Sequence, residues 1–128
     1  MKHIFYIALG GSLGAVARYV VSKNFQSLFG TIFPFGTLFV NATGSFVIGF
    51  LFNLFENTIL PNDLKSFLTI GFLGAYTTFS TYSLETVNFI KDGEFRISAL
   101  NILSSNIICI LMVVAGIIAA RAVIKFAR

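Results

Sequence analysis

The chain has 128 residues, of which 56% are hydrophobic and only 11% are charged. A soluble domain carries about 25% charged residues, so this chain cannot cover a globular surface with its own charges. The net charge is +4, but the basic residues stand at the ends of apolar runs and form no stripe. This pattern excludes a nucleic-acid module and fits the flanks of membrane spans. The composition therefore predicts a small integral membrane protein.

Four apolar runs are long enough to cross a bilayer, because a transmembrane helix needs about 20 mainly apolar residues. They predict an all-α protein with spans over residues 4–22, 35–55, 66–90 and 97–120, joined by short connectors. The polar stretch over residues 22–31 is expected to be the first connector. No repeat or second domain is visible, so residues 1–128 are predicted to form a single membrane domain.

A secretory signal peptide is the competing interpretation of the N-terminus. Lys2 supplies a positive charge, and Ala15-Val16-Ala17 resembles a cleavage site. The apolar core of residues 4–9 is short, however, and glycines follow it at once, which favours a span. Gly10 and Gly14 form a Gly-x-x-x-Gly pair that suits close helix packing in lipid.

The cations in the loops give almost no orientation signal. Four spans place both termini on one side, with five basic residues there against four on the other: Lys2, Lys65, Arg121, Lys125 and Arg128 against Arg18, Lys23, Lys91 and Arg96. A chain without charge bias can insert both ways and so form an antiparallel dimer from one sequence. A single, weakly biased orientation is the alternative.

Polar residues follow one helical face in each of two spans, at a spacing of i, i+4, i+8. They are Thr37, Asn41 and Ser45 in the second span, and Asn101, Ser105 and Cys109 in the fourth. Each line can serve as interhelical hydrogen bonding or as a polar track for an ion, and the residue types alone leave both open.

The third span contains its own signal for a broken helix. Gly71 and Gly74 loosen it, and the threonine hydroxyls that follow, beginning at Thr77, can replace backbone partners. A break at mid-membrane is tolerated only inside protein or along a cavity, and carbonyls freed there can hold a hard cation. Phe79 and Tyr82 share a face, either for packing or for a site.

Ionisable residues inside the spans favour anions. Arg18 either extends to the membrane surface or faces an aqueous vestibule, where it would raise the local anion concentration. No acid matches it in the first two spans. One histidine, no nucleophile–base set and no paired carboxylates indicate that the protein is not an enzyme.

Three motifs resemble the Fluc (CrcB) fluoride channel family, and the resemblance covers essentially the whole chain. They are GGSLGAVAR at residues 10–18, GTLFVNATG at 36–44 and GFLGAYTTFST at 71–81. The resemblance implies a dual-topology, antiparallel homodimer in the cell (inner) membrane. Two pores would export fluoride down its electrochemical gradient and protect the cell from fluoride toxicity.

The resemblance also implies roles for individual residues. Asn41 matches a pore asparagine that donates to the ion, and Phe79 and Tyr82 match a pair of pore phenylalanines whose ring edges face the anion. The polar track is matched by Thr37, Ser80, Thr81 and Ser105. Arg18 matches a vestibule arginine. Backbone carbonyls of Gly74 and Thr77 from both subunits would hold a structural Na⁺ at the dimer interface.

Two departures and two rivals accompany this prediction. Tyr82 stands where the family usually has phenylalanine, and Ala75 where it often has a second glycine.

The first rival is a four-helix proton-coupled exporter, for which Glu85 would be the membrane carboxylate. The second is an assembly subunit of a larger complex, whose glycine-rich faces would be packing surfaces. We favour an interfacial role for Glu85.

Overall fold

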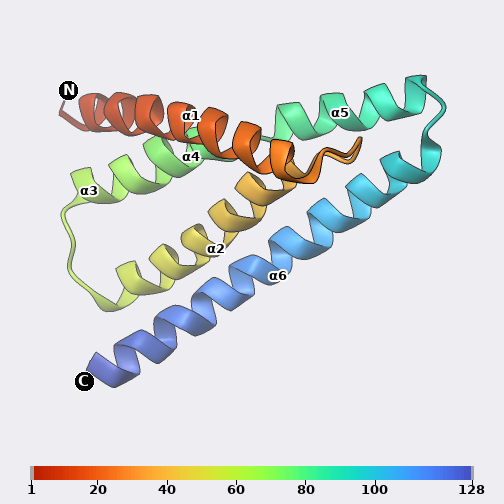
Figure 1. Ribbon diagram of the computed structural model, residues 1–128. Coiled ribbons are helices and arrows are strands. Elements are labelled where there is room, and N and C mark those ends of the chain that lie inside the picture. Colours follow the sequence, from red (N-terminus) through yellow and green to blue (C-terminus); the bar gives the residue numbers. More distant parts are fainter. Residues whose placement is uncertain (1, 128) are drawn as a thin grey trace.

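The computed structural model describes residues 2–127, and within this range it contains helices and no strands (Figure 1). Met1 and Arg128, which the predicted domain and charge count include, lie outside the described residues. The elements in chain order are α1 (Lys2–Phe29), α2 (Phe35–Asn57), α3 (Asn62–Ser66), η1 (Phe67–Leu73), α4 (Gly74–Tyr76), α5 (Phe79–Lys91) and α6 (Phe95–Ala127). Of these, α1, α2 and α6 are long and apolar enough to cross a membrane. The all-α fold class is confirmed.

The third predicted span consists of four short elements, α3, η1, α4 and α5. In Figure 1, α3 and α4 lie below α1, and α5 continues from them toward the upper right of the view. η1 is a π-helix, a wider coil that is typical of functional sites. Thr77 and Thr78 then leave the helix with ψ angles of 156° and 116°. The predicted break in the third span is therefore confirmed, and it lies at these two residues.

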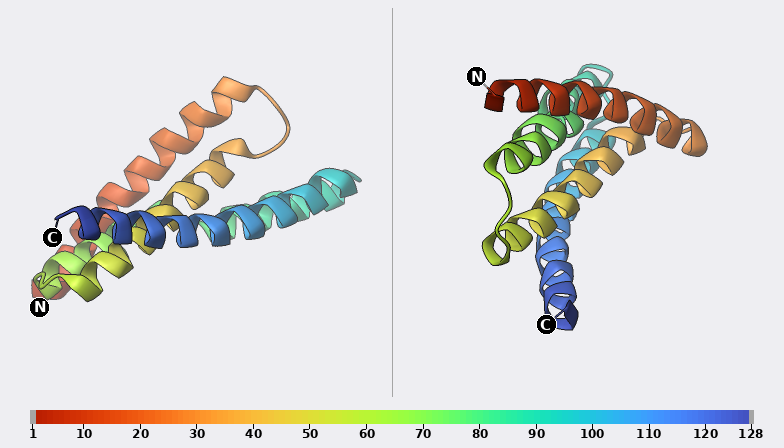
Figure 2. Two further views of the ribbon diagram at one scale, coloured as in Figure 1. Left: turned by 90° about the horizontal axis from the view of Figure 1, so that it is seen from below. Right: turned by 90° about the vertical axis from the view of Figure 1, so that its left-hand side faces the viewer.

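The expected connector over residues 22–31 is wrong, because α1 continues through most of it. Residues 22–29 contain no glycine or proline. Gly30 follows the end of the helix with a φ of 55°, a conformation that glycine adopts without steric cost. The side chain of Gln26 then donates to the carbonyls of Thr31 and Phe33, at 3.0 Å each. This turn closes α1 and α2 into the hairpin seen in Figure 2.

Glycines allow two close backbone contacts on which the bundle depends. α2 and α6 share the most extensive helix contact and lie side by side in Figure 1. A Cβ at Gly49 would overlap the backbone of Val113 on α6. On the other side of the molecule, a Cβ at Gly14 of α1 would overlap the backbone of Phe72 in η1.

Large apolar side chains remain exposed over much of the single chain. Ile4, Phe79 and Phe126 are 70%, 77% and 91% exposed, whereas Val40 and Ala120 are fully buried. A surface this apolar requires lipid or further protein around it, in agreement with a membrane setting.

The packing of α1 on η1 predicts different effects for two neighbouring glycines. Gly14→Ala should lower the free energy of unfolding by about 1–3 kcal/mol, the usual cost of overpacking. Gly11→Ala is the matched control, because the nearest atom to its added Cβ is the Gly71 carbonyl oxygen at 3.9 Å. Circular dichroism melting in detergent measures both, and equal melting temperatures would contradict the packing described.

Candidate functional site at the helix break

The site begins with the two threonines that interrupt the third span. The backbone N–H and the hydroxyl of Thr77 both donate to the Leu73 carbonyl at 3.0 Å, and so end the α4 turn. Thr78 starts α5 as its N-cap, with its hydroxyl accepting from the N–H of Thr81 at 3.2 Å. Threonine is suited to both positions, since its hydroxyl replaces backbone partners at helix ends.

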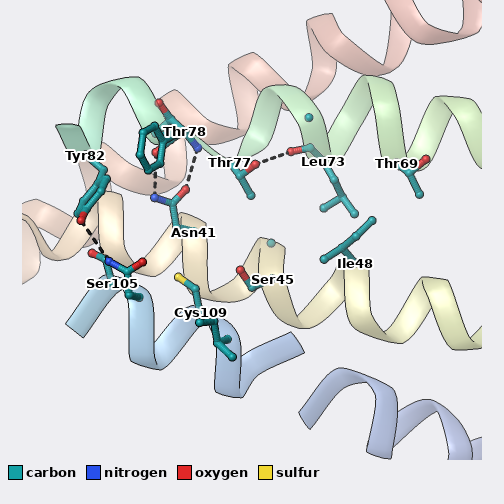
Figure 3. A pocket seen from close by; sticks show the side chains of 15 residues that line it. Asn41, Ser45, Ile48, Thr69, Leu73, Thr77, Thr78, Tyr82, Ser105 and Cys109 are labelled. Atoms are coloured by element: carbon teal, nitrogen blue, oxygen red, sulfur yellow. Dashed lines mark hydrogen bonds between the residues drawn. The ribbon is translucent and has the colours of Figure 1, made fainter. Parts of the chain in front are cut away.

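Asn41, on the neighbouring helix α2, stabilises the interrupted backbone through its side-chain amide (Figure 3). Its side-chain Nδ2 donates to the Thr78 carbonyl at 2.9 Å, and its Oδ1 accepts from the Thr78 N–H at 2.7 Å. The amide therefore satisfies both backbone groups of one residue where no helix can. An asparagine amide carries two N–H donors, so one donor remains after these two bonds are made.

Two predicted sodium ligands meet at the same break. In a continuous helix the Thr78 N–H would bond to the Gly74 carbonyl, but here it bonds to Asn41, which leaves the Gly74 carbonyl without that partner. The Thr77 carbonyl accepts a long bond of 3.5 Å from Nη1 of Arg18. The Gly74 oxygen thus fits a hard cation, whereas the Thr77 oxygen is shared with a guanidinium.

Arg18 is half-buried, and its guanidinium donates to the backbone carbonyl of Thr77 at the helix break. The sequence offered two interpretations, extension to the membrane surface or an aqueous vestibule, and neither included this contact. The vestibule role stays a prediction. A guanidinium beside an interrupted helix also stabilises its exposed carbonyl groups, so Arg18 supports the broken backbone.

A cavity of about 420 Å³ lies between α2, the break and α6. It brings together four of the predicted pore residues, Asn41, Phe79, Tyr82 and Ser105. Figure 3 shows Asn41 and Ser45 from α2 facing Ser105 and Cys109 from α6, with Thr77 and Thr78 above them. Two members of each polar line read from the sequence therefore face this cavity, whereas Thr37 and Asn101 do not line it. Within the described chain, the residues that line it are uncharged.

The aromatic pair at this cavity has one exposed and one buried member. The rings of Phe79 and Tyr82 are 5.4 Å apart and inclined at 55°. Phe79 is 77% exposed, whereas Tyr82 is 9% exposed. The Tyr82 hydroxyl accepts a hydrogen bond of 3.3 Å from Nδ2 of Asn106 on α6. The extra hydroxyl at this position therefore has a defined partner.

The remaining predicted pore residues lie elsewhere. Thr37 and Thr81 line a second cavity of about 360 Å³, together with Glu85 and Lys23. Thr37 donates to Oε1 of Glu85 at 2.7 Å, and among the described residues Oε2 of Glu85 is buried without a hydrogen-bond partner. Ser80 is exposed, with its hydroxyl 3.4 Å from that of Thr78.

Sequence reasoning missed three polar residues that complete the site. Thr78 was part of a quoted motif, but its bonds to Asn41 join residues 37 positions apart. Asn106 stands next to Ser105 in the sequence but off the i, i+4 line. Thr86 accepts from Asn101 at 3.0 Å and so ties α5 to α6. A search for polar positions at both i+4 and i+5 along the fourth span would have found Asn106.

Comparison with known proteins identifies the family of this chain. A family model described as CrcB-like protein, Camphor Resistance (CrcB), matches residues 5–117. A protein of Magnetococcus marinus is 47% identical over 92% of this chain and 97% of its own length. One of Geobacter sulfurreducens is 45% identical over 94% and 98%. Both are described as fluoride-specific ion channel FluC. This chain therefore belongs to the CrcB family, whose members are multi-pass membrane proteins and not enzymes.

Proposed function

We propose that the chain forms a fluoride-selective channel. The observation that carries this proposal is the pair of relatives at 45–47% identity, both described as fluoride-specific channels, which match more than nine-tenths of the chain. The geometry supports it, because two of the three motifs shared with the Fluc family, at residues 36–44 and 71–81, contribute residues to one cavity at the helix break.

The chemistry of the cavity suits a small, strongly hydrated anion. A selective path must replace the ion's water with donors and still release the ion. The free N–H of Asn41 and the positively polarised edges of the Phe79 and Tyr82 rings offer such weak, neutral partners. The Ser105 hydroxyl lines the same cavity and would exchange its long bond of 3.4 Å to Oδ1 of Asn101 for the ion. The N-terminus of α5 begins at the same place, and the positive end of its helix dipole favours an anion.

Fluoride would leave the cell because of its charge. An inside-negative membrane potential favours outward movement of an anion by about 2.3 kcal/mol per 100 mV. Export then needs neither a coupled ion nor a membrane carboxylate. The channel would thus protect the cell from fluoride toxicity with the membrane potential as its driving force.

The proposal includes an antiparallel homodimer with two pores. Two features of the chain support it: the nearly even split of basic residues between the two sides, and the exposure of Phe79 at the edge of the cavity. A second copy would cover Phe79 and complete the wall of each pore. The Gly74 carbonyl, whose helical partner Thr78 N–H bonds to Asn41 instead, supports a structural Na⁺ between the two breaks, held by Gly74 and Thr77 of both copies.

Anion efflux from liposomes tests the proposed function. We expect rapid fluoride efflux when valinomycin balances the charge, none without it, and no chloride efflux under matched gradients. An assembly subunit would conduct neither anion.

The coupled-exporter alternative is tested in the same assay with Glu85→Gln. The glutamine oxygen retains the bond from Thr37, so the channel should keep valinomycin-dependent fluoride efflux. An exporter would lose transport with its titratable carboxylate. Efflux that is driven by a proton gradient in the wild type and abolished by Glu85→Gln would overturn the channel.

Asn41→Asp should reduce fluoride efflux at least about tenfold. The aspartate loses both N–H donors, so the Thr78 carbonyl is left unpaired, which costs about 1–3 kcal/mol, and its charge repels an anion. Asn88→Asp is the matched control, since Asn88 is exposed on α5 and lines neither cavity at the break. A fluoride electrode measures the initial rates. Equal rates for the two folded variants would show that the Asn41 amide is not needed.

Dual topology predicts that half of the copies expose each loop. In a Cys109→Ser background, Asp92→Cys places one thiol in the connector between α5 and α6. A membrane-impermeant maleimide added to intact cells should label about half of the protein, since a chain without charge bias inserts both ways. Labelling of all or none of the copies would show a single orientation.

A further inference from the structure

A third cavity lies away from the helix break, where the C-terminal ends of α2 and α6 run side by side (Figure 1). Its volume is about 240 Å³, and it is lined by Asn53, Asn57, Arg121, Ile124 and Lys125. It shares no residue with the two cavities at the break, so the proposed pore does not account for it.

The charge of this cavity is positive. Arg121 and Lys125 stand one turn apart on α6. Within residues 2–127 the ion pair that forms is between His3 and Asp63, so neither Arg121 nor Lys125 is paired with an acidic side chain of that range. The charge-free run of the fourth span ends at Ala120. Arg121 therefore marks the edge of the hydrocarbon region, and the cavity opens at the depth of lipid headgroups.

The opposite wall holds a polar group without a partner. Asn53 is only 6% exposed, and within the described residues its Oδ1 is buried with no hydrogen bond. Asn57 does not satisfy it, because its amide donates at 2.8 Å to the backbone carbonyl of Asn53. Buried polar groups are nearly always paired, so this oxygen lacks a donor that a ligand would bring.

We infer that this cavity binds a phosphate group at the membrane surface. Arg121 and Lys125 bind the phosphate oxygens through charge-assisted hydrogen bonds. Oδ1 of Asn53 accepts from a hydroxyl carried by the same ligand. An anionic phosphodiester headgroup with a free hydroxyl, as in phosphatidylglycerol, supplies both features. Soluble phosphate supplies the same oxygens and, in its singly protonated form, a hydroxyl.

Competition between three lipids tests this site on the purified full-length protein. Phosphatidylglycerol, phosphatidylethanol and phosphatidylcholine are mixed equally in detergent micelles, and native mass spectrometry counts the bound lipids. Phosphatidylethanol has the same charge as phosphatidylglycerol but lacks the hydroxyl. We expect phosphatidylglycerol to bind best, then phosphatidylethanol, then phosphatidylcholine. Equal binding of phosphatidylglycerol and phosphatidylcholine would overturn the inference.

Variants distinguish the contribution of the basic wall of the cavity from that of the asparagine wall. The pair Arg121→Gln and Lys125→Gln should lower phosphatidylglycerol binding by about fivefold for each charge removed. The pair Lys91→Gln and Arg96→Gln, both exposed outside this cavity, removes the same two residue types and should change nothing. Asn53→Ala should abolish the preference for phosphatidylglycerol over phosphatidylethanol. Equal losses in both charge pairs would mean a general surface effect and would overturn the site.

A final competition experiment shows whether the phosphate group comes from a lipid or from a soluble ligand. Excess inorganic phosphate is added to the wild-type complex, with sodium chloride at equal ionic strength as the control. Release of phosphatidylglycerol by phosphate alone supports the site and assigns it to a soluble ligand. Retention of the lipid under both conditions supports the site and assigns it to the membrane.

Discussion

The pair of hydrogen bonds between Asn41 and the backbone of Thr78 is the interaction on which the rest of the site depends. A broken helix inside a membrane exposes backbone groups that lipid cannot satisfy. Asn41 supplies a donor and an acceptor from α2, so the chain can leave the helix at Thr77 while both backbone groups of Thr78 keep hydrogen-bond partners. That departure opens the cavity between α2, α5 and α6, and it aims the N-terminus of α5 and the Phe79 ring at the same space.

Close backbone packing keeps these elements in register. Gly14 brings α1 against η1, just before the break, and Gly49 brings α2 against α6, which holds Asn41 and Ser105 on facing walls. A larger side chain at either glycine would separate helices whose polar faces must meet. These glycines therefore act on the site by setting the distance between helices, and the proposed ion path is lined by neutral hydroxyl, amide and aromatic groups.

The sequence predicted the helical class, the approximate positions of the helices and the break in the third span, because hydropathy indicates apolar helices and the glycine–threonine run indicates a weak helix. Through its resemblance to the Fluc family it also grouped Asn41, Phe79, Tyr82 and Ser105, which the structure brings to one cavity. The same group included Thr37, Ser80 and Thr81, which do not line that cavity. The sequence could not predict the Asn41–Thr78 bonds, which join residues far apart in the chain, or the contact of Arg18 with the Thr77 carbonyl. The end of α1 was misplaced because polarity marks where a span leaves the membrane, whereas a helix continues until a residue such as Gly30 stops it.

A cryo-electron microscopy structure of the protein in lipid nanodiscs tests the central claim most directly, since it shows the break, the cavity and the assembly together. The account predicts two antiparallel copies, each with the Asn41 amide bonded to both backbone groups of Thr78 and with Phe79 covered by the partner subunit. A continuous helix through Thr77 and Thr78, or an Asn41 side chain turned away from the break, would contradict it.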